Sequence, residues 1–289
     1  MQVSIGIMAY NEEANIAQLL QSIQKQKLNT VSIKEIIVVS SGSTDNTNKI
    51  VKDLSKKNKK IKLILEKERK GKYSAINKFL KKASARVCIL CSSDLRLEKD
   101  TIEQLCLPLL DSKIGIVGAR PIPLNPQQGY LGYAVNLLWN LHHEIAKRNP
   151  KFGELIAFRK VFDKIDKTAV DEEEIAMKII NNYEFIPAYA SKSIVYNKGP
   201  ETIKDFVKQR RRIYAGHLEL KKKTGYASST MVKSKIFNAL IKSKAISILN
   251  LDRLLFATFL EAYSRGLGWW DLNIKKKKHY VWDIARSTK

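Results

Sequence analysis

The chain has 289 residues, and its 52 Lys and Arg against 28 Asp and Glu give a formal net charge of +24. With 44% hydrophobic and 28% charged residues, the composition is that of a folded protein with a substantial core, which excludes an intrinsically disordered chain. The positive field attracts polyanions, which include nucleic acids, anionic lipid surfaces and phosphorylated substrates.

Cysteine usage indicates a reducing compartment. Three cysteines do not make a secreted disulfide framework. Cys88 and Cys91 have the spacing of a redox or zinc half-site, but they fall in an apolar run that predicts a buried strand. We therefore expect buried thiols and a cytoplasmic protein. Because the chain begins directly with a strand pattern, we also expect no signal peptide.

The first half of the chain alternates strand and helix patterns. Apolar, β-branched runs and helical spacing predict, in turn, a strand at 3–8, a helix at 15–23, a strand at 35–39, a helix from 45, a strand at 61–65, a helix at 73–82 and a strand at 87–91. Such alternation favours a mostly parallel sheet flanked by helices, in which ligands bind beyond the carboxyl ends of the strands. The loops at 9–13, 40–45 and 92–96 should therefore form a single crevice.

The middle of the chain is less regular, and three prolines interrupt it between 121 and 126. Apolar runs predict strands at 114–117, 153–158 and 185–190 and an aromatic helix at 130–146. A helix that starts with four adjacent acids, 171–174, lies between the last two strands. The helix dipole favours one or two acids at such an N-terminus, but four in a row repel one another.

From about Thr202 the chain is predicted to be helical and basic. Its run Gln209-Arg210-Arg211-Arg212 places three guanidiniums side by side, which is unfavourable unless an anionic group lies opposite. A guanidinium fork matches phosphate oxygens in two-pronged geometry. The alternative is a solvated basic face that continues to Lys221-Lys222-Lys223.

Residues 246–265 are strongly apolar, but Asp252, Arg253 and Glu261 interrupt them, so we predict no bilayer span. One helical face carries Asn250, Arg253, Ala257, Glu261 and Ser264, and the opposite face carries Ile248, Leu251, Leu255, Phe259 and Ala262. This pattern fits a helix in the bilayer interface or one packed on the domain. Trp269-Trp270 and the lysines 275–278 follow. Aromatic side chains and lysines are the residues that the headgroup region of an anionic membrane prefers. The alternative is a core helix with a solvated basic tail.

Seven motifs occur in a fixed order, at 9–13, 38–47, 71–77, 92–94, 153–160, 170–179 and 209–213. In these motifs the chain resembles the family-2 glycosyltransferases, inverting enzymes of the GT-A fold. The resemblance covers about residues 3–216. It implies an α/β fold with a GT-A catalytic domain at 1–201, in which 1–97 binds the nucleotide sugar and 98–201 the acceptor. Residues 202–289 would form a basic, helical, membrane-facing region that includes the Gln-x-x-Arg segment.

The resemblance also implies the roles of individual residues. Glu172 aligns with the family's catalytic base, and Asp171 lies one residue away. Asp94 would hold a divalent cation, Mg²⁺ or Mn²⁺. The residues implied for the nucleotide sugar are Ala9, Tyr10, Asn11, Glu12, Ser41, Asp45, Lys72, Ser93, Asp94, Gln209, Arg210, Arg211 and Arg212.

Three departures from the family pattern matter. Ser92 stands where the first aspartate of Asp-x-Asp is usual, which leaves only Asp94 for the metal. The usual Glu-Asp order is swapped to Asp171-Glu172. Ile213 replaces a tryptophan, so aromatic stacking against an acceptor is not expected there.

We therefore predict an inverting hexosyltransferase that moves a sugar from a UDP-linked donor to a lipid or lipid-linked acceptor. It would be peripherally bound to an anionic membrane on the cytoplasmic face. Two alternatives stay open. Ser92 allows a degenerate GT-A protein that binds nucleotide without turnover. The charge allows a nucleic-acid-binding protein, but the lysines are scattered with little aromatic interleaving and no recognition motif is present, so no nucleic-acid partner is predicted.

Overall fold

The computed structural model describes residues 1–243, 247–281 and 287. The chain divides into two compact units. Unit 1 comprises Met1–Pro121, Phe152–Lys167 and Asp171–Tyr196, and unit 2 comprises Ile122–Lys151, Thr168–Val170 and Asn197–Lys289. The predicted functional boundary at residue 201 stays a prediction, because these units follow packing rather than function.

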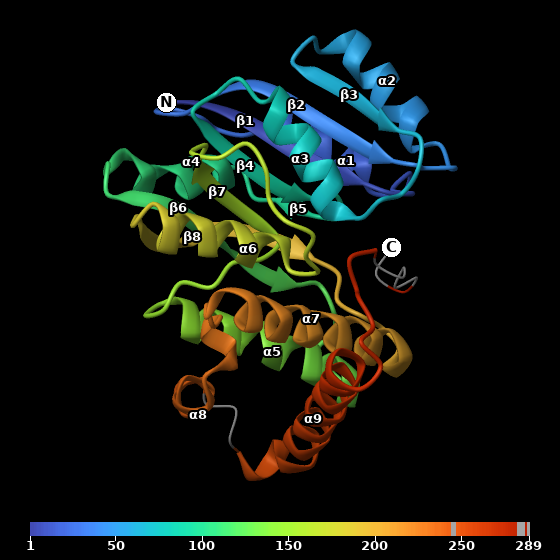
Figure 1. Cartoon of the computed structure of the whole chain (residues 1–289), viewed down its shortest axis with the longest axis vertical. Coiled ribbons are helices and arrows are strands. Elements are labelled where there is room, and N and C mark those ends of the chain that lie inside the picture. Colours follow the sequence, from blue (N-terminus) through green and yellow to red (C-terminus); the bar gives the residue numbers. More distant parts are fainter. Residues whose placement is uncertain (244–246, 282–286, 288–289) are drawn as a thin grey trace. The chain divides into compact units, whose positions relative to one another are not determined.

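Unit 1 is built on a mixed sheet with the strand order β3-β2-β1-β4-β7-β6-β8-β5 (Figure 1). The strands are β1 (Gln2–Ala9), β2 (Ser32–Ser41), β3 (Ile61–Glu66), β4 (Val87–Ser92), β5 (Arg96–Leu97), β6 (Ile114–Pro123), β7 (Leu155–Arg159) and β8 (Ile186–Asn197). The first four strands are parallel neighbours, whereas β7 pairs antiparallel with both β4 and β6, and β5 pairs antiparallel with β8. The α/β sheet predicted from the alternating pattern is confirmed.

Helices cover this sheet through apolar residues at helical spacing. The helices of unit 1 are α1 (Ile16–Gln24), α2 (Thr47–Lys57), α3 (Lys72–Lys82), α4 (Thr101–Cys106) and α6 (Asp171–Met177), with short turns η1 (Leu107–Leu110) and η2 (Lys178–Asn182). Close approach of α3 to β1 depends on Gly6, because a Cβ there would lie 2.6 Å from the ring of Phe79. All three cysteines are buried free thiols, as predicted.

Unit 2 is mainly helical. It contains α5 (Tyr130–Ala146), α7 (Ile203–Thr224), α8 (Lys233–Lys242) and α9 (Leu251–Asn273), with short turns η3 (Ser229–Met231) and η4 (Ile248–Asn250). A small core joins α5, α7 and α9 through Ala134, Val135, Leu137, Phe206, Ala257 and Leu260. The packing of α9 on α7 is close, since a Cβ on Gly268 would lie 2.6 Å from the carbonyl oxygen of Arg211.

Helix α9 turns its more polar face inward and its apolar face outward. Ser264 is fully buried and Glu261 is partly buried, whereas the side chains of Leu255 and Phe259 are 62% and 69% exposed. The sequence predicted the two faces, but left open which of them would be buried. Ile246 and the side chain of Ile248, which belong to the same predicted helix, lie outside the described residues.

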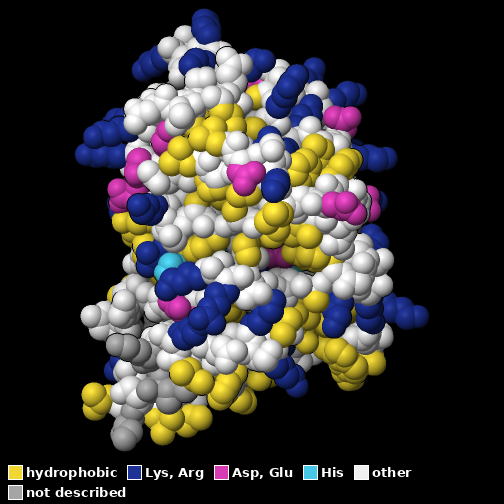
Figure 2. Space-filling view, turned by 90° about the vertical axis from the view of Figure 1, so that its left-hand side faces the viewer, with side chains coloured by type: hydrophobic (Ala, Val, Ile, Leu, Met, Phe, Trp, Pro, Cys, Tyr) yellow, Lys and Arg dark blue, Asp and Glu magenta, His cyan; other side chains and the backbone are white. Residues whose placement is uncertain are grey.

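None of the helices in the described part of the chain is both long and apolar enough to cross a bilayer. This agrees with the prediction that charges interrupt residues 246–265. Figure 2 shows hydrophobic side chains at its lower end, where α8 and the start of α9 lie in Figure 1.

Candidate active site

The loops that follow β1 and β2 are hydrogen-bonded to each other. The backbone N–H of Asn11 donates to Ser43 Oγ at 3.1 Å, and the N–H of Thr44 donates to Asn11 Oδ1 at 2.8 Å. Asn11 adopts a left-handed backbone conformation with φ of 52°, which asparagine tolerates better than most residues. The carboxyl ends of adjacent parallel strands meet at one edge, so the contact between these two loops follows from the topology, while the single crevice stays a prediction.

Asp45 organises the second of these loops. Its carboxylate accepts hydrogen bonds from the N–H of Glu13 at 3.0 Å and from the N–H and Oγ1 of Thr47 at 3.0 and 2.6 Å. Thr47 Oγ1 also accepts from the N–H of Glu12 at 2.7 Å. Asp45 therefore fixes the shape of the loop, while its predicted contact with a nucleotide stays a prediction.

A buried glutamate at the end of β3, Glu66, was not predicted as part of the site. It accepts hydrogen bonds from Ser41 Oγ and, at 2.8 Å, from Ser74 Oγ. It thereby ties the loop after β2 to the first turn of α3. A signal was present in the sequence, because Glu66 ends an apolar strand at the same edge.

Tyr10 and Arg69 form a cation–π contact, with the guanidinium carbon 4.0 Å from the ring centroid. Both side chains are partly exposed. Tyr10 was predicted as a nucleotide-sugar contact, whereas Arg69 was not. The pair presents a flat ring and a positive charge at the same edge of the sheet, which suits a stacked base or a phosphate.

Asp94 lies in an acidic environment after β4. Burial is the main cause that raises the pKa of its carboxyl to about 7, and the carboxylates of Glu154 and Glu12 contribute to the same shift. Glu154 directly precedes β7, and its carbonyl oxygen accepts from the N–H of Ser92 at 2.9 Å. Its φ of 58° is unfavourable for glutamate, so the turn holds this residue in place at some cost. Glu154 was not predicted as a site residue.

These carboxylates fit the divalent cation that the family implies only if other groups complete its coordination. Among the described residues, no group of three or more His, Cys, Asp or Glu is arranged to hold a metal ion. However, Mg²⁺ often takes only one or two protein carboxylates together with substrate phosphates. The mutual repulsion that raises the pKa of Asp94 is what a nearby cation would relieve.

Lys72 at the start of α3 bonds to Glu172 at the start of α6, with Nζ 2.5 Å from Oε1. Each side chain is only 13% exposed. Burial by itself lowers the pKa of Lys72, but the carboxylates of Glu172, Asp171 and Glu154 outweigh it and raise that pKa above its usual value. The ion pair therefore favours the charged form of Lys72 inside unit 1. The sequence predicted both residues, but not their contact.

The four acids of α6 differ in exposure. Asp171 is fully buried, and Glu173 and Glu174 are 2% and 3% exposed. Glu173 Oε1 accepts from the N–H of Phe152 at 3.3 Å, which is a structural contact. Glu172 is the one of the four with appreciable access, so its carboxylate is better placed than that of Asp171 to meet a substrate hydroxyl.

The Gln209–Arg212 segment lies on α7 in unit 2, where two of its arginines have carboxylate partners. Arg210 makes a two-pronged ion pair with Glu261, both hydrogen bonds being 2.8 Å, and Arg211 pairs with Asp271. Arg212 donates to the carbonyl oxygen of Ala169 at 3.2 Å. Arg210 and Arg211 therefore fasten α9 to α7, a role that the sequence did not predict. Phosphate contacts by this segment, including Gln209, stay a prediction.

Residues 4–167 match the model of the family described as glycosyl transferase family 2. This is more than half of the chain, and the chain belongs to that family. The family that the ordered motifs predicted is thus confirmed.

Among curated proteins, the chain is 28% identical over 241 residues to a probable glycosyltransferase, YdaM, of Bacillus subtilis, which covers 75% of this chain and 55% of that protein. It is 32% identical over 122 residues to a dolichol-phosphate mannosyltransferase of Pyrococcus furiosus, which covers 42% of this chain and 33% of that protein. The chain spans about half the length of the first curated relatives it matches.

Among solved structures, a mannosyltransferase from Pyrobaculum calidifontis in complex with GDP-Man and Mn²⁺ matches 95% of this chain and 88% of its own, with a TM-score of 0.66 and 20% identity. Glucosyl-3-phosphoglycerate synthase from Mycobacterium tuberculosis, with Mn²⁺, UDP and phosphoglyceric acid, matches 79% of this chain and 80% of its own, with a TM-score of 0.55 and 19% identity. These likenesses confirm the predicted GT-A fold.

Proposed function

We propose that this chain transfers a sugar with inversion from a nucleotide sugar to a lipid or lipid-linked acceptor at a membrane surface. The observation that carries the catalytic half of the proposal is the buried Lys72–Glu172 ion pair. It joins a cation suited to a leaving diphosphate to the most accessible carboxylate of the acidic helix.

In this mechanism Glu172 is the general base. The acceptor hydroxyl gives its proton to the Glu172 carboxylate as its oxygen bonds to the anomeric carbon, while the bond from that carbon to the nucleotide diphosphate breaks. A single displacement of this kind inverts the anomeric centre and needs no nucleophile from the protein. The buried Asp171 would contribute negative charge behind Glu172 rather than accept the proton itself.

Lys72 would stabilise the negative charge that develops on the leaving diphosphate. Before the donor binds, its ammonium is bonded to Glu172. A diphosphate competes for the same ammonium, so donor binding weakens the ion pair and leaves Glu172 more basic. This ordering would suppress proton abstraction until the donor is in place.

Asp94 is the residue that would hold a divalent cation, with Glu154 as the second carboxylate in place of the missing aspartate at Ser92. A bound cation would supply Lewis-acid stabilisation to the diphosphate. Glu154 suits this role because its carboxylate is close enough to raise the pKa of Asp94. A degenerate, non-catalytic protein would have no need of a second carboxylate here.

The nucleotide would lie over the loops after β1 and β2, where Tyr10 offers a ring and Arg69 a positive charge. We propose a uridine-linked donor. Solved structures with this fold contain GDP-Man or UDP-GlcNAc, so both bases belong in any test.

The membrane half of the proposal is supported by α9. Its outward apolar face includes Leu255 and Phe259, and Trp269 and Trp270 near its end are 49% and 47% exposed. Lysines 275–278 follow at once. Exposed apolar and aromatic side chains beside a lysine cluster match the interface of an anionic bilayer.

The chemistry can be tested by screening UDP- and GDP-sugars for thermal stabilisation with and without Mn²⁺, followed by transfer with the best donor. Proton NMR of the product then reports its anomeric configuration. We expect inversion relative to the donor. Retention of the anomeric configuration would rule out the single displacement. If no donor stabilised the protein, the nucleotide-sugar site would be ruled out.

The membrane half is tested separately by flotation with phosphatidylglycerol vesicles at low salt. We expect the protein to float, and the double variant Leu255→Ser/Phe259→Ser to float about tenfold less, since both side chains would leave water on binding. Thr258→Ser, a change at a neighbouring exposed position of α9, should behave as the unaltered protein. Unaltered protein that stays in the aqueous fraction would contradict this half alone.

A further inference from the structure

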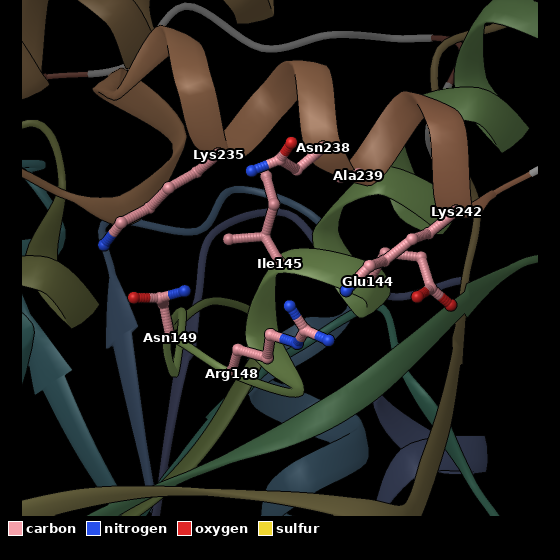
Figure 3. Close-up of a pocket in the computed structure, with 8 residues that line it drawn as sticks. All are labelled: Glu144, Ile145, Arg148, Asn149, Lys235, Asn238, Ala239 and Lys242. Carbon is pink, nitrogen blue, oxygen red and sulfur yellow. The ribbon is translucent and has the colours of Figure 1, made fainter.

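Unit 2 contains a cavity of about 110 Å³ between the end of α5 and helix α8. Figure 3 shows that α5 and the turn after it contribute Glu144, Arg148 and Asn149, while α8 contributes Lys235, Asn238 and Lys242. No residue of this cavity belongs to the site proposed for the nucleotide sugar.

The lining combines positive charge with amide groups. Lys235 reaches from α8 toward Asn149, and the guanidinium of Arg148 points into the space between the two elements (Figure 3). The one carboxylate, Glu144, is paired with Lys147 at 2.6 Å. Within the described part of the chain, Arg148, Lys235 and Lys242 have no carboxylate within salt-bridge distance. The cavity therefore has a net positive lining.

Helix dipoles explain part of this arrangement but not all of it. Arg148 follows the last turn of α5 and Lys242 lies in the last turn of α8, where a cation is stabilised by about 0.3–1 kcal/mol. Lys235 is different, because it lies in the first turn of α8, where the dipole opposes a positive charge. Lys235 is half-buried, and the exposed Arg148 and Lys242 add to the positive field around it, which a bound anion would neutralise.

A phosphate group fits this lining better than other anions do. It accepts a two-pronged pair of hydrogen bonds from a guanidinium, takes further bonds from ammonium groups, and has oxygens left for the amide N–H groups of Asn149 and Asn238. Phe237 and Ile241, which alternate along α8 with the lining residues Asn238 and Lys242, are 61% and 54% exposed. A phosphate bound here would thus lie next to an apolar surface that also faces solvent.

We propose that the cavity between α5 and α8 is a binding site for a phosphate group. That phosphate is carried either by an anionic lipid headgroup, whose chains would contact Phe237 and Ile241, or by a soluble phosphate ester. The site is independent of the nucleotide-sugar site and would bind its ligand whether or not transfer occurs.

The test is a calorimetric titration of the full chain with inorganic phosphate and with glycerol 3-phosphate. We expect saturable binding that the double variant Lys235→Gln/Lys242→Gln weakens by about tenfold or more, as the loss of two charge-assisted contacts requires. Lys235→Arg, which keeps the charge, should retain most of the affinity. Unchanged thermal unfolding of the variants would show that the fold is intact.

Lys233→Gln is the matched control. It removes the same charge from the same helix two residues earlier, at an exposed position that does not line the cavity. Its affinity should stay within about twofold of the unaltered protein if the contacts are local. No saturable binding of either probe, or equal weakening by Lys233→Gln and Lys235→Gln, would overturn the proposal.

Vesicles identify the source of the phosphate. If it is a headgroup, binding to phosphatidylglycerol vesicles will fall more for Lys235→Gln than for Lys233→Gln. Phosphatidylcholine vesicles that contain short-chain phosphatidic acid will show the same difference between the two variants. If it is a soluble ester, the two variants will bind vesicles equally while their affinities for glycerol 3-phosphate differ. Both results support a phosphate site at the cavity.

Discussion

The two units handle charge in opposite ways. Unit 1 gathers carboxylates at the carboxyl edge of its sheet, where Asp94 has a raised pKa and Glu172 pairs with Lys72. Unit 2 neutralises its internal charges by two-pronged pairs, as in Arg210–Glu261, and leaves cations and apolar side chains outside. Internal charge that is paired is costly to break and so fixes how helices pack, whereas a group whose pKa is shifted by like charge is a candidate for chemistry.

The largest effect expected from this difference is on catalysis in unit 1. Glu172→Gln should slow transfer by a factor of about 10²–10⁴, because the variant keeps the size of the side chain but cannot accept the proton. Donor affinity should be unchanged or higher, since Lys72 loses its competing partner. Steady-state rates and donor titrations measure the two quantities. Glu68→Gln, at an exposed position, is the control, and full activity of Glu172→Gln would place the base elsewhere.

The next effect concerns stability in unit 2. Glu261→Gln should lower the free energy of unfolding by about 2–3 kcal/mol, because Arg210 is left without its carboxylate in a mostly buried position. Chemical denaturation measures this change. Glu201→Gln, which removes an exposed ion pair with Lys198, should cost less than about 0.5 kcal/mol. Equal losses for the two variants would mean that the pair does not hold α9 to α7.

Removal of carboxylates at the edge of unit 1 should weaken cation binding. Asp94→Asn should reduce the affinity for Mn²⁺ by about tenfold or more, and Glu154→Gln by a smaller factor, because a hard cation depends on the number of charged oxygens. Electron paramagnetic resonance of free Mn²⁺ gives these affinities without any assay of activity. Asp100→Asn, at an exposed position, serves as the control, and no change in Glu154→Gln would exclude it as a ligand.

A smaller effect is expected from two buried histidines of unit 2. Burial is the main cause that lowers the pKa of His142 to about 3 and that of His217 well below its usual value, with Lys151 adding to both. Below the usual pKa of about 6.5 the unfolded chain binds protons that the folded chain does not. Stability is therefore complete above this value and falls as the pH drops toward 3.

Thermal unfolding between pH 7 and pH 4.5 tests this dependence. The midpoint should fall with pH in the unaltered protein and fall less in the double variant His142→Leu/His217→Leu. The neighbouring, partly exposed His143 provides the control variant His143→Gln, which should keep the dependence. Equal slopes in all three proteins would show that other groups set the acid limit.

The sequence was sufficient for the elements of unit 1. Their apolar periodicity and the ordered motifs are local signals, so the strands and the loops after them could be predicted directly, while the roles of residues such as Glu172 stay predictions. Glu154 and Glu66 could not be predicted, because their roles depend on which strands and helices become neighbours. Glu154 enters the site only because β7 pairs with β4, far away along the chain.

Unit 2 was harder to predict for the same physical reason. The arginines on α7 suggested an anionic ligand, and the carboxylates that two of them meet lie on α9 about fifty or sixty residues later, beyond the reach of helical spacing. Amphipathicity identified both faces of α9, but which one is buried depends on those ion pairs. The cation-lined cavity between α5 and α8 likewise depends on helix packing alone.

The proposal that unit 1 is a donor site is tested most directly by titrating a panel of UDP- and GDP-sugars, with Mn²⁺ present, into the unaltered protein and into Lys72→Gln. We predict saturable binding of at least one donor, weakened by about tenfold in Lys72→Gln, which loses one charge-assisted contact with the diphosphate. Lys81→Gln, which alters an exposed lysine on the same helix, should bind that donor as the unaltered protein does. Binding of no donor, or equal affinity in Lys72→Gln and the unaltered protein, would contradict it.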